Sequence, residues 1–193
     1  MGKITVVNNV TLDGVMQSPA RPDEDTRGGF THGGWAVPYQ DPVMARKMGE
    51  MMASGEGSML LGRRTYEDFF SVWPKRTDNP YTEFLNKVKK YVASTTLKEP
   101  LPWENSVLLS DDAADAVTAL KREHNESFTI LGSGELIKSL IRRNLIDEYV
   151  LLIYPLALGT GHRMFPEGET VRLRLVDSLT TPSGVIITTF LPA

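Results

Sequence analysis

The chain has 193 residues, a formal net charge of -3 and no cysteine. This length suits one domain with a sizeable core, so we expect a single domain over residues 1–193. A charge this close to zero creates no field that would attract nucleic acid or an anionic membrane. Without cysteine there are no disulfides, thiolate nucleophiles or cysteine-based metal sites, and the composition is compatible with the reducing cytoplasm, where we expect the protein.

The amino-terminal segment 3–10 is β-branched and apolar, which predicts a buried strand that ends near Asp13. It contains no long apolar stretch of the kind found in signal peptides, and no run approaches the roughly 18 apolar residues of a membrane span. Residues 17–39 are rich in glycine and proline, and a loop of this length in a compact domain is often a functional lid. Alternatively, its aromatic residues, such as Phe30 and Trp35, only anchor the loop to the core.

Helix and strand signals then alternate along the chain. Asp41 followed by Pro42 is typical of a helix N-cap and first helical residue. Residues 57–62 form a short apolar run between glycines, which predicts a strand. Thr65 with Asp68 three residues later fits a capping box, so the next helix should begin at Thr65, directly after two arginines.

The rest of the chain continues this alternation. The predicted elements are a helix at 79–87, strands at 90–94 and 106–109, a helix capped by Ser110-Asp111-Asp112, a strand at 128–131, an amphipathic helix to about 143, and strands at 147–154, 171–178 and 185–191. Such an order implies an α/β fold with a mainly parallel sheet and an antiparallel C-terminal edge. In the strand at 171–178, apolar residues alternate with arginines, so only one face should be exposed to solvent.

Residues suited to phosphate binding follow three of the predicted strands. They are Gly62-Arg63-Arg64-Thr65, Ser94-Thr95-Thr96 and Gly132-Ser133-Gly134. Ligands of open α/β sheets bind outside the carboxyl ends of the strands, so these turns could share one ligand with several phosphates. The arginines and hydroxyls could hold a phosphate monoester, and the glycine turn with its helix a pyrophosphate. The alternative is that Gly132–Gly134 is an ordinary strand-to-helix connection.

Other known motifs do not fit. Ile137 replaces the third glycine of the Rossmann fingerprint, and Arg63 replaces the lysine of a P-loop. The histidines, which are His32, His124 and His162, lack ligand spacing, so we expect no metal site. Acid–base catalysis would therefore depend on carboxylates, and Asp13 and Asp41 lie nearest to the proposed crevice. Each is also explained without catalysis, Asp13 as a turn residue and Asp41 as a helix cap.

Four segments of the sequence together resemble the dihydrofolate reductase fold. They are Leu12-Asp13-Gly14 after the first strand, Gly62–Glu67, Ser94-Thr95 and Ile130–Gly134. The connector Pro155–Gly161, with Met164-Phe165, is most similar to the reductase-domain family of riboflavin biosynthesis and its bacterial relatives. This resemblance covers nearly the whole chain. It implies a dihydrofolate reductase-like sheet of about eight strands with helices on both faces, and a homodimer.

The resemblance also implies NADPH as the hydride donor. The resemblance places Arg63 and Thr95, which follow Gly62 and Ser94, at the adenosine 2′-phosphate, and Arg64 and Thr65 at the phosphates near their helix start. It places the pyrophosphate along Gly132, Ser133, Gly134 and Glu135. The loop that covers the nicotinamide would contain Val15 and Met16. Asp41 falls close to the acidic residue that holds the pterin ring in dihydrofolate reductases. The Pro-Trp pair that precedes that acid is absent here, and Glu135 stands where a basic residue is common.

We therefore expect an enzyme, an NADPH-dependent oxidoreductase that acts on a small pyrimidine- or pteridine-like heterocycle. Its partners would be this substrate and a second copy of the chain, with no nucleic acid and no membrane. Two alternatives stay open. One is dihydrofolate reductase itself, and the other is a dimeric nucleotide-binding protein that keeps the fold without catalysis.

Overall fold

The computed structural model describes residues 1–53, 57–77 and 80–193, and the predicted helix start at Asn79 lies outside them. The chain forms two compact units. Unit 1 comprises Met1–Thr5 and Glu56–Leu145, and unit 2 comprises Val6–Gly55 and Ile146–Ala193. The expectation of a single domain stays a prediction.

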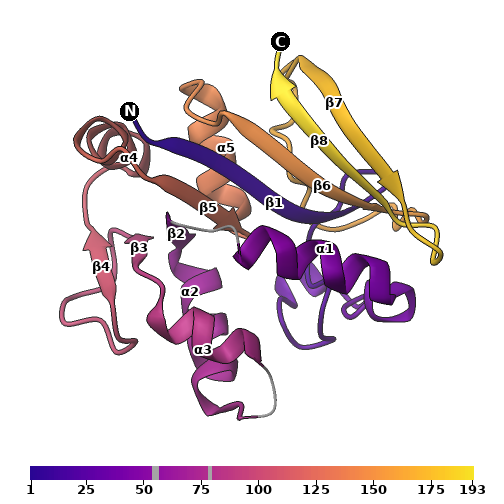
Figure 1. The fold of residues 1–193 in the computed structure, drawn as a ribbon, viewed down its shortest axis with the longest axis horizontal. Coiled ribbons are helices and arrows are strands. Elements are labelled where there is room, and N and C mark those ends of the chain that lie inside the picture. Colours follow the sequence, from indigo (N-terminus) through magenta and orange to yellow (C-terminus); the bar gives the residue numbers. More distant parts are fainter. Residues whose placement is uncertain (54–56, 78–79) are drawn as a thin grey trace. The chain divides into compact units, whose positions relative to one another are not determined.

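The strands form one sheet in the order β4-β3-β2-β5-β1-β6-β8-β7 (Figure 1). Their bounds are β1 Lys3–Thr11, β2 Gly57–Gly62, β3 Lys90–Ala93, β4 Ser106–Leu109, β5 Ser127–Leu131, β6 Glu148–Tyr154, β7 Leu173–Thr180 and β8 Ile186–Pro192. β2 is parallel to β3 and β5, and β3 is parallel to β4, whereas β8 is antiparallel to β6 and β7. The mainly parallel sheet with an antiparallel C-terminal edge is confirmed.

The helices are α1 Pro42–Ala53, α2 Arg63–Val72, α3 Pro80–Lys87, α4 Ala113–Glu123 and α5 Gly134–Arg142. Asp112 caps α4 as expected, since its carboxylate accepts hydrogen bonds from the amides of Ala114 (3.0 Å) and Asp115 (3.2 Å). The predicted start of α2 at Thr65 is wrong, because the helix begins at Arg63 with Gly62 as its N-cap. Across the residues that the model describes, no helix is long and apolar enough to cross a bilayer.

The core of unit 1 is built on both faces of β2. Met59 and Leu61 pack in one cluster with Tyr66 of α2, Leu85 of α3 and other buried residues. Side chains alternate along a strand, so Leu60, which is 0% exposed, is buried on the opposite face. A strand covered on both faces exposes polar groups only where it ends, and the carboxyl ends of such strands are the usual ligand sites of this fold class.

In unit 2, the 17–39 loop is anchored by its aromatic residues. Phe30 and Trp35 are buried, and the Trp35 ring packs edge-on against Tyr154 of β6 with 5.1 Å between centroids. Tyr39 packs against the same ring at 5.7 Å. The aromatic residues therefore anchor the loop to the core, which was the alternative to a lid in the sequence analysis. A lid function of the loop stays a prediction.

The edge strand β7 differs from the expectation of one buried face. Nearly all of its residues are exposed, including Leu175 at 52%, Val176 at 44% and Leu179 at 40%. β7 pairs with β8 and has an irregular register between Leu175 and Asp177. This bulge shifts the alternation of side chains, so apolar residues reach solvent on both sides of it.

Candidate functional site

The three turns predicted to bind phosphate lie at neighbouring strand ends in unit 1. β2 lies between β3 and β5 in the sheet and is parallel to both. Gly62 pairs with Ala93 at the carboxyl ends of β2 and β3, so Arg63 and Ser94 follow at the same edge. β5 ends at Leu131, directly before the Gly-Ser-Gly turn. The fold therefore brings together the three turns that the sequence singled out.

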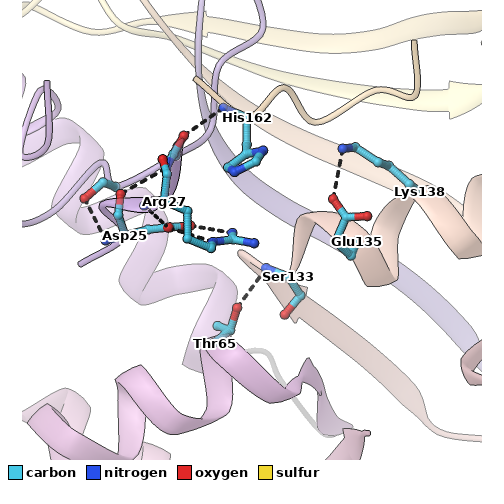
Figure 2. Close-up of polar contacts among 9 residues, drawn as sticks. Asp25, Arg27, Thr65, Ser133, Glu135, Lys138 and His162 are labelled. Carbon is cyan, nitrogen blue, oxygen red and sulfur yellow. Dashed lines mark hydrogen bonds and ion pairs between the residues drawn. The ribbon is translucent and has the colours of Figure 1, made fainter. Parts of the chain in front are cut away.

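Ser133 ties the turn after β5 to the junction of β2 and α2. Its amide donates a hydrogen bond to Oγ1 of Thr65 (2.9 Å, Figure 2), and the amide of Gly62 donates to Oγ of Ser133 (3.0 Å). The Ser133 hydroxyl donates in turn to the carbonyl of Leu131 (3.1 Å). These bonds commit the Ser133 amide and the Thr65 hydroxyl to the protein. Both residues were predicted to touch phosphate, and the geometry gives them a structural task at that place.

The backbone of this turn is left-handed at two successive residues. Gly132 has φ of 57° and Ser133 has φ of 58°. A Cβ at position 132 would lie 3.2 Å from Oγ1 of Thr65, so glycine is favoured there both by conformation and by the close approach of Thr65. Ser133 tolerates its left-handed conformation because the surrounding hydrogen bonds hold it.

The N-cap residues of α2 and α5, Gly62 and Ser133, make no side-chain cap hydrogen bond. The amides in the first turn of a helix have no acceptor within the helix, and the helix dipole makes this end positive. Two such ends, one after β2 and one after β5, are joined through Thr65 and Ser133. This arrangement can bind an anion with more than one negative group.

Each of these two helices also carries a cation that is paired with a carboxylate of the same helix. Nη1 of Arg63 lies 2.9 Å from Oε2 of Glu67. Nζ of Lys138 lies 3.1 Å from Oε1 of Glu135 (Figure 2). Arg64, the second residue of α2, is exposed. Arg63 and Lys138 are therefore each balanced by a carboxylate of their own helix.

The turn after β3 carries exposed hydroxyl residues at Thr95 and Thr96 and a buried one at Ser94. Oγ of Ser94 accepts hydrogen bonds from the amides of Thr96 (3.1 Å) and Leu97 (3.0 Å), so this buried side chain shapes the turn. Thr95 is exposed. Of the two predicted ligand contacts in this turn, Thr95 is the one whose side chain faces solvent.

In unit 2, the carboxylate of Asp13 orients the connector at 155–161. It accepts hydrogen bonds from the hydroxyl of Thr11 (2.6 Å) and from the amides of Leu158 (3.1 Å) and Gly159 (2.8 Å). These bonds, led by that of Thr11, hold the pKa of Asp13 below its usual value. Asp13 is therefore a stabilised carboxylate that fixes a turn, and its catalytic role stays a prediction.

Asp41 joins the start of α1 to the turn between β7 and β8. Its Oδ1 accepts a hydrogen bond from the amide of Met44 (2.9 Å), and its Oδ2 accepts from the hydroxyl of Ser183 (2.5 Å) and from the Ser183 amide (3.3 Å). The Ser183 hydroxyl, followed by the Met44 amide, holds the pKa of Asp41 far below its usual range. The helix-cap explanation is confirmed, and a catalytic role of Asp41 stays a prediction.

Val15 and Met16, predicted to cover a nicotinamide ring, are attached to the same connector region. Val15 forms an antiparallel bridge with Arg163, and the amide of Met16 donates to the carbonyl of His162 (2.9 Å). Gly161 lies beneath them, because a Cβ at this position would approach a Val15 methyl group and the Phe30 ring to 2.7 Å. The connector glycine therefore allows the loop to pack closely on this segment.

Gln17 organises the 17–39 loop, and sequence reasoning missed it. The side chain is 3% exposed. Nε2 donates to the carbonyls of Asp25 and Arg27 (3.0 Å each), and Oε1 accepts from the amide of His162 (2.9 Å). Asp25, Arg27 and His162, whose backbone groups make these contacts, are labelled in Figure 2. A lone glutamine in a loop carries no periodic or spacing signal, so only the folded chain reveals this role.

Within the part of the chain that the model describes, no three His, Asp or Glu side chains gather closely enough to hold a metal ion.

The model of the RibD C-terminal domain family matches residues 2–187. The chain belongs to the RibD C-terminal domain family. A relative, uncharacterized protein YyaP of Bacillus subtilis (strain 168), is 30% identical over 135 residues, which cover 67% of this chain and 70% of YyaP. This match leaves about a third of each chain unaligned.

Solved structures show the fold of this RibD C-terminal domain. The "putative riboflavin biosynthesis protein" of Shewanella sp. PV-4 has a TM-score of 0.74 at 22% identity, with 99% of both chains covered. Dihydrofolate reductase of Enterococcus faecalis, solved with NADP(H), has a TM-score of 0.62 at 14% identity, with 99% of this chain and 96% of that chain covered. The expected dihydrofolate reductase-like fold is confirmed.

Replacing Gln17 by leucine should destabilise this RibD C-terminal domain, because the substitution leaves two carbonyls and one amide without their partner. We expect a loss of about 2–4 kcal/mol in the free energy of unfolding, measured by urea denaturation. The matched control is Gln40→Leu, because Gln40 is exposed at the end of the same loop. Equal stabilities of the two variants would contradict the role of Gln17.

Replacing Asp41 by asparagine should destabilise the protein in a pH-dependent way. A carboxylate with a lowered pKa stabilises the fold above its unfolded pKa of about 4, and this contribution is lost as the pH falls through the folded pKa. The difference in unfolding free energy between wild type and Asp41→Asn should therefore be constant from about pH 8 to 5 and shrink below about pH 4. Ser183→Ala should reproduce part of this effect. A difference that stays constant down to about pH 3 would contradict the assignment.

Proposed function

We propose that the protein is an NADPH-dependent reductase of a small pyrimidine- or pteridine-like heterocycle. The observation that carries the proposal is the pair of uncapped helix starts at adjacent strand ends, with Arg63 and Arg64 in the first turn of α2. Membership of the RibD C-terminal domain family and the NADP(H) complex of the Enterococcus faecalis enzyme support it. A cytoplasmic location belongs to the same proposal, since the chain has no disulfide that would require an oxidising compartment.

The residues at this edge of unit 1 fit a dinucleotide. Arg63 and Thr95 would hold the 2′-phosphate, and Arg64 and Thr65 would lie near the phosphates at the start of α2, since guanidinium groups pair well with phosphate oxygens. The starts of α2 and α5 would hold the pyrophosphate, since glycine at position 132 removes the side chain that would crowd the turn. The contact of Val15 and Met16 with a nicotinamide ring stays a prediction from the sequence. When bound, the cofactor supplies a hydride, and the protein binds and orients it.

The two candidate catalytic carboxylates, Asp13 and Asp41, are poor proton donors. Hydrogen bonds lower the pKa of both Asp13 and Asp41, and an efficient general acid has a pKa near the working pH. We therefore assign both residues to orientation of the backbone, and we assign the rate enhancement to positioning of cofactor and substrate.

Dihydrofolate reduction is the second candidate, because the fold is shared with the Enterococcus faecalis enzyme. The contacts of Asp41 count against it. Its carboxylate is engaged by the Met44 amide and by Ser183, so an acid held in this way has little capacity left for a pterin ring. The non-catalytic alternative, a nucleotide-binding dimer, also agrees with the lowered pKa values.

We also propose a homodimer formed through β7. This edge strand exposes Leu175, Val176 and Leu179, and exposed apolar side chains on an unpaired sheet edge favour association. A second copy of the same strand would cover these side chains and complete the hydrogen bonding of the edge.

NADPH should bind with saturation in a fluorescence titration, and Arg63→Ala should weaken this binding by about tenfold through loss of a charge-assisted contact. Binding of NADH, which has no 2′-phosphate, should change by about twofold or less. Equal losses for both dinucleotides would remove the role of Arg63. An absence of saturable binding of either dinucleotide would contradict the proposed cofactor.

Loss of NADPH absorbance with pyrimidine substrates but not with dihydrofolate would separate the two candidate reductases, and binding without turnover of any substrate would favour the non-catalytic dimer.

Light scattering after gel filtration should give a mass of two chains, that is, about twice 21.5 kDa. Leu175→Glu should shift the protein to the mass of one chain, because a charge would be buried in the interface. The control is Val37→Glu, which changes an equally exposed residue in the 17–39 loop. A monomeric wild-type protein, or a dimer unaffected by Leu175→Glu, would rule out this interface.

A further inference from the structure

Arg63 is already occupied by a carboxylate of its own helix. Its Nη1 lies 2.9 Å from Oε2 of Glu67, one helical turn further along α2. The two side chains are 36% and 46% exposed, so a ligand can reach the pair from solvent. A phosphate that approaches Arg63 meets a guanidinium whose charge is partly neutralised, and it also meets the negative charge of Glu67.

We propose that Glu67 determines cofactor specificity by lowering the preference for a 2′-phosphorylated dinucleotide. This inference rests on the proposed function. NADPH and NADH differ only in the 2′-phosphate, so a charge that acts at Arg63 changes the affinity for NADPH and leaves that for NADH unchanged. Glu67 therefore sets the ratio of the two affinities.

Glu135 gives an internal comparison. It lies in the first turn of α5 and pairs with Lys138, at the turn assigned to the pyrophosphate. Both dinucleotides carry the pyrophosphate, so removal of the Glu135 charge should strengthen the binding of both to the same extent. Removal of the Glu67 charge should therefore change the affinity for NADPH alone, whereas removal of the Glu135 charge should change the affinities for both dinucleotides.

The size of the Glu67 effect follows from the energies of exposed charges. The pair of Glu67 with Arg63 is exposed, so its loss has a modest effect, and repulsion between the carboxylate and the phosphate adds a contribution of similar size. Replacing Glu67 by glutamine should therefore raise the affinity for NADPH by about three- to tenfold. Salt screens exposed charges, so the gain should be smaller at about 1 M salt than at 0.01 M.

The experiment measures the dissociation constants of NADPH and NADH by calorimetry for the wild type, Glu67→Gln and Glu135→Gln. The matched control is Glu83→Gln, which removes the same charge from an equivalent pair with Lys87 on α3. We expect Glu67→Gln to raise the ratio of NADPH to NADH affinity, Glu135→Gln to leave the ratio unchanged, and Glu83→Gln to change neither affinity.

A second pair of variants tests whether Glu67 acts through Arg63. In an Arg63→Ala background, the gain from Glu67→Gln should disappear, and a gain that persists in full would overturn this route. If NADPH and NADH bind but Glu67→Gln does not change their ratio, the inference fails and the proposed function stands. If neither dinucleotide binds to the wild type or to Glu67→Gln, the proposed function itself fails.

Discussion

The hydrogen bond from the Ser133 amide to the Thr65 hydroxyl fixes the spacing of two helix starts. β2 and β5 pair from Gly57 to Met59. Near their carboxyl ends, hydrogen bonds that involve the side chains of Ser133 and Thr65 connect the segments that follow the two strands. Because the protein supplies both partners of this bond, the two helix ends are held before any ligand arrives. A preorganised anion site loses less free energy on binding than one that the ligand must assemble.

In unit 2, polar side chains hold irregular backbone segments in place. Its long loop and its connector contain backbone groups that no helix or sheet satisfies, and buried groups of this kind need partners. Gln17 and Asp13 supply them through hydrogen bonds to residues that are distant in the sequence. The Asp13 carboxylate is therefore engaged in holding the backbone, and in the proposed reductase this favours orientation of the reactants over proton transfer by this group.

Local sequence signals predicted the elements well where the physics is local. The strand at 106–109 has the predicted bounds, and Asp112 caps its helix as expected. Thr65 shows the limit of such signals, since it satisfies the capping-box pattern yet bonds to Ser133, 68 residues away. Gln17 is a similar case, because one of its partners, the amide of His162, follows it by 145 residues. Contacts at such separations leave no periodicity that a single sequence can display.

The pairing of Glu67 with Arg63 and of Glu135 with Lys138 connects stability to specificity. Carboxylates near a helix start interact favourably with the dipole, and pairs three or four residues apart stabilise the helix by a few tenths of a kcal/mol. The same carboxylates oppose a phosphate at that end. Two arginines without a nearby carboxylate would bind phosphate more tightly but would repel each other in the empty protein. Under the proposed function, the sequence of α2 balances the stability of its first turns against affinity for a 2′-phosphate, and these two requirements conflict at Glu67.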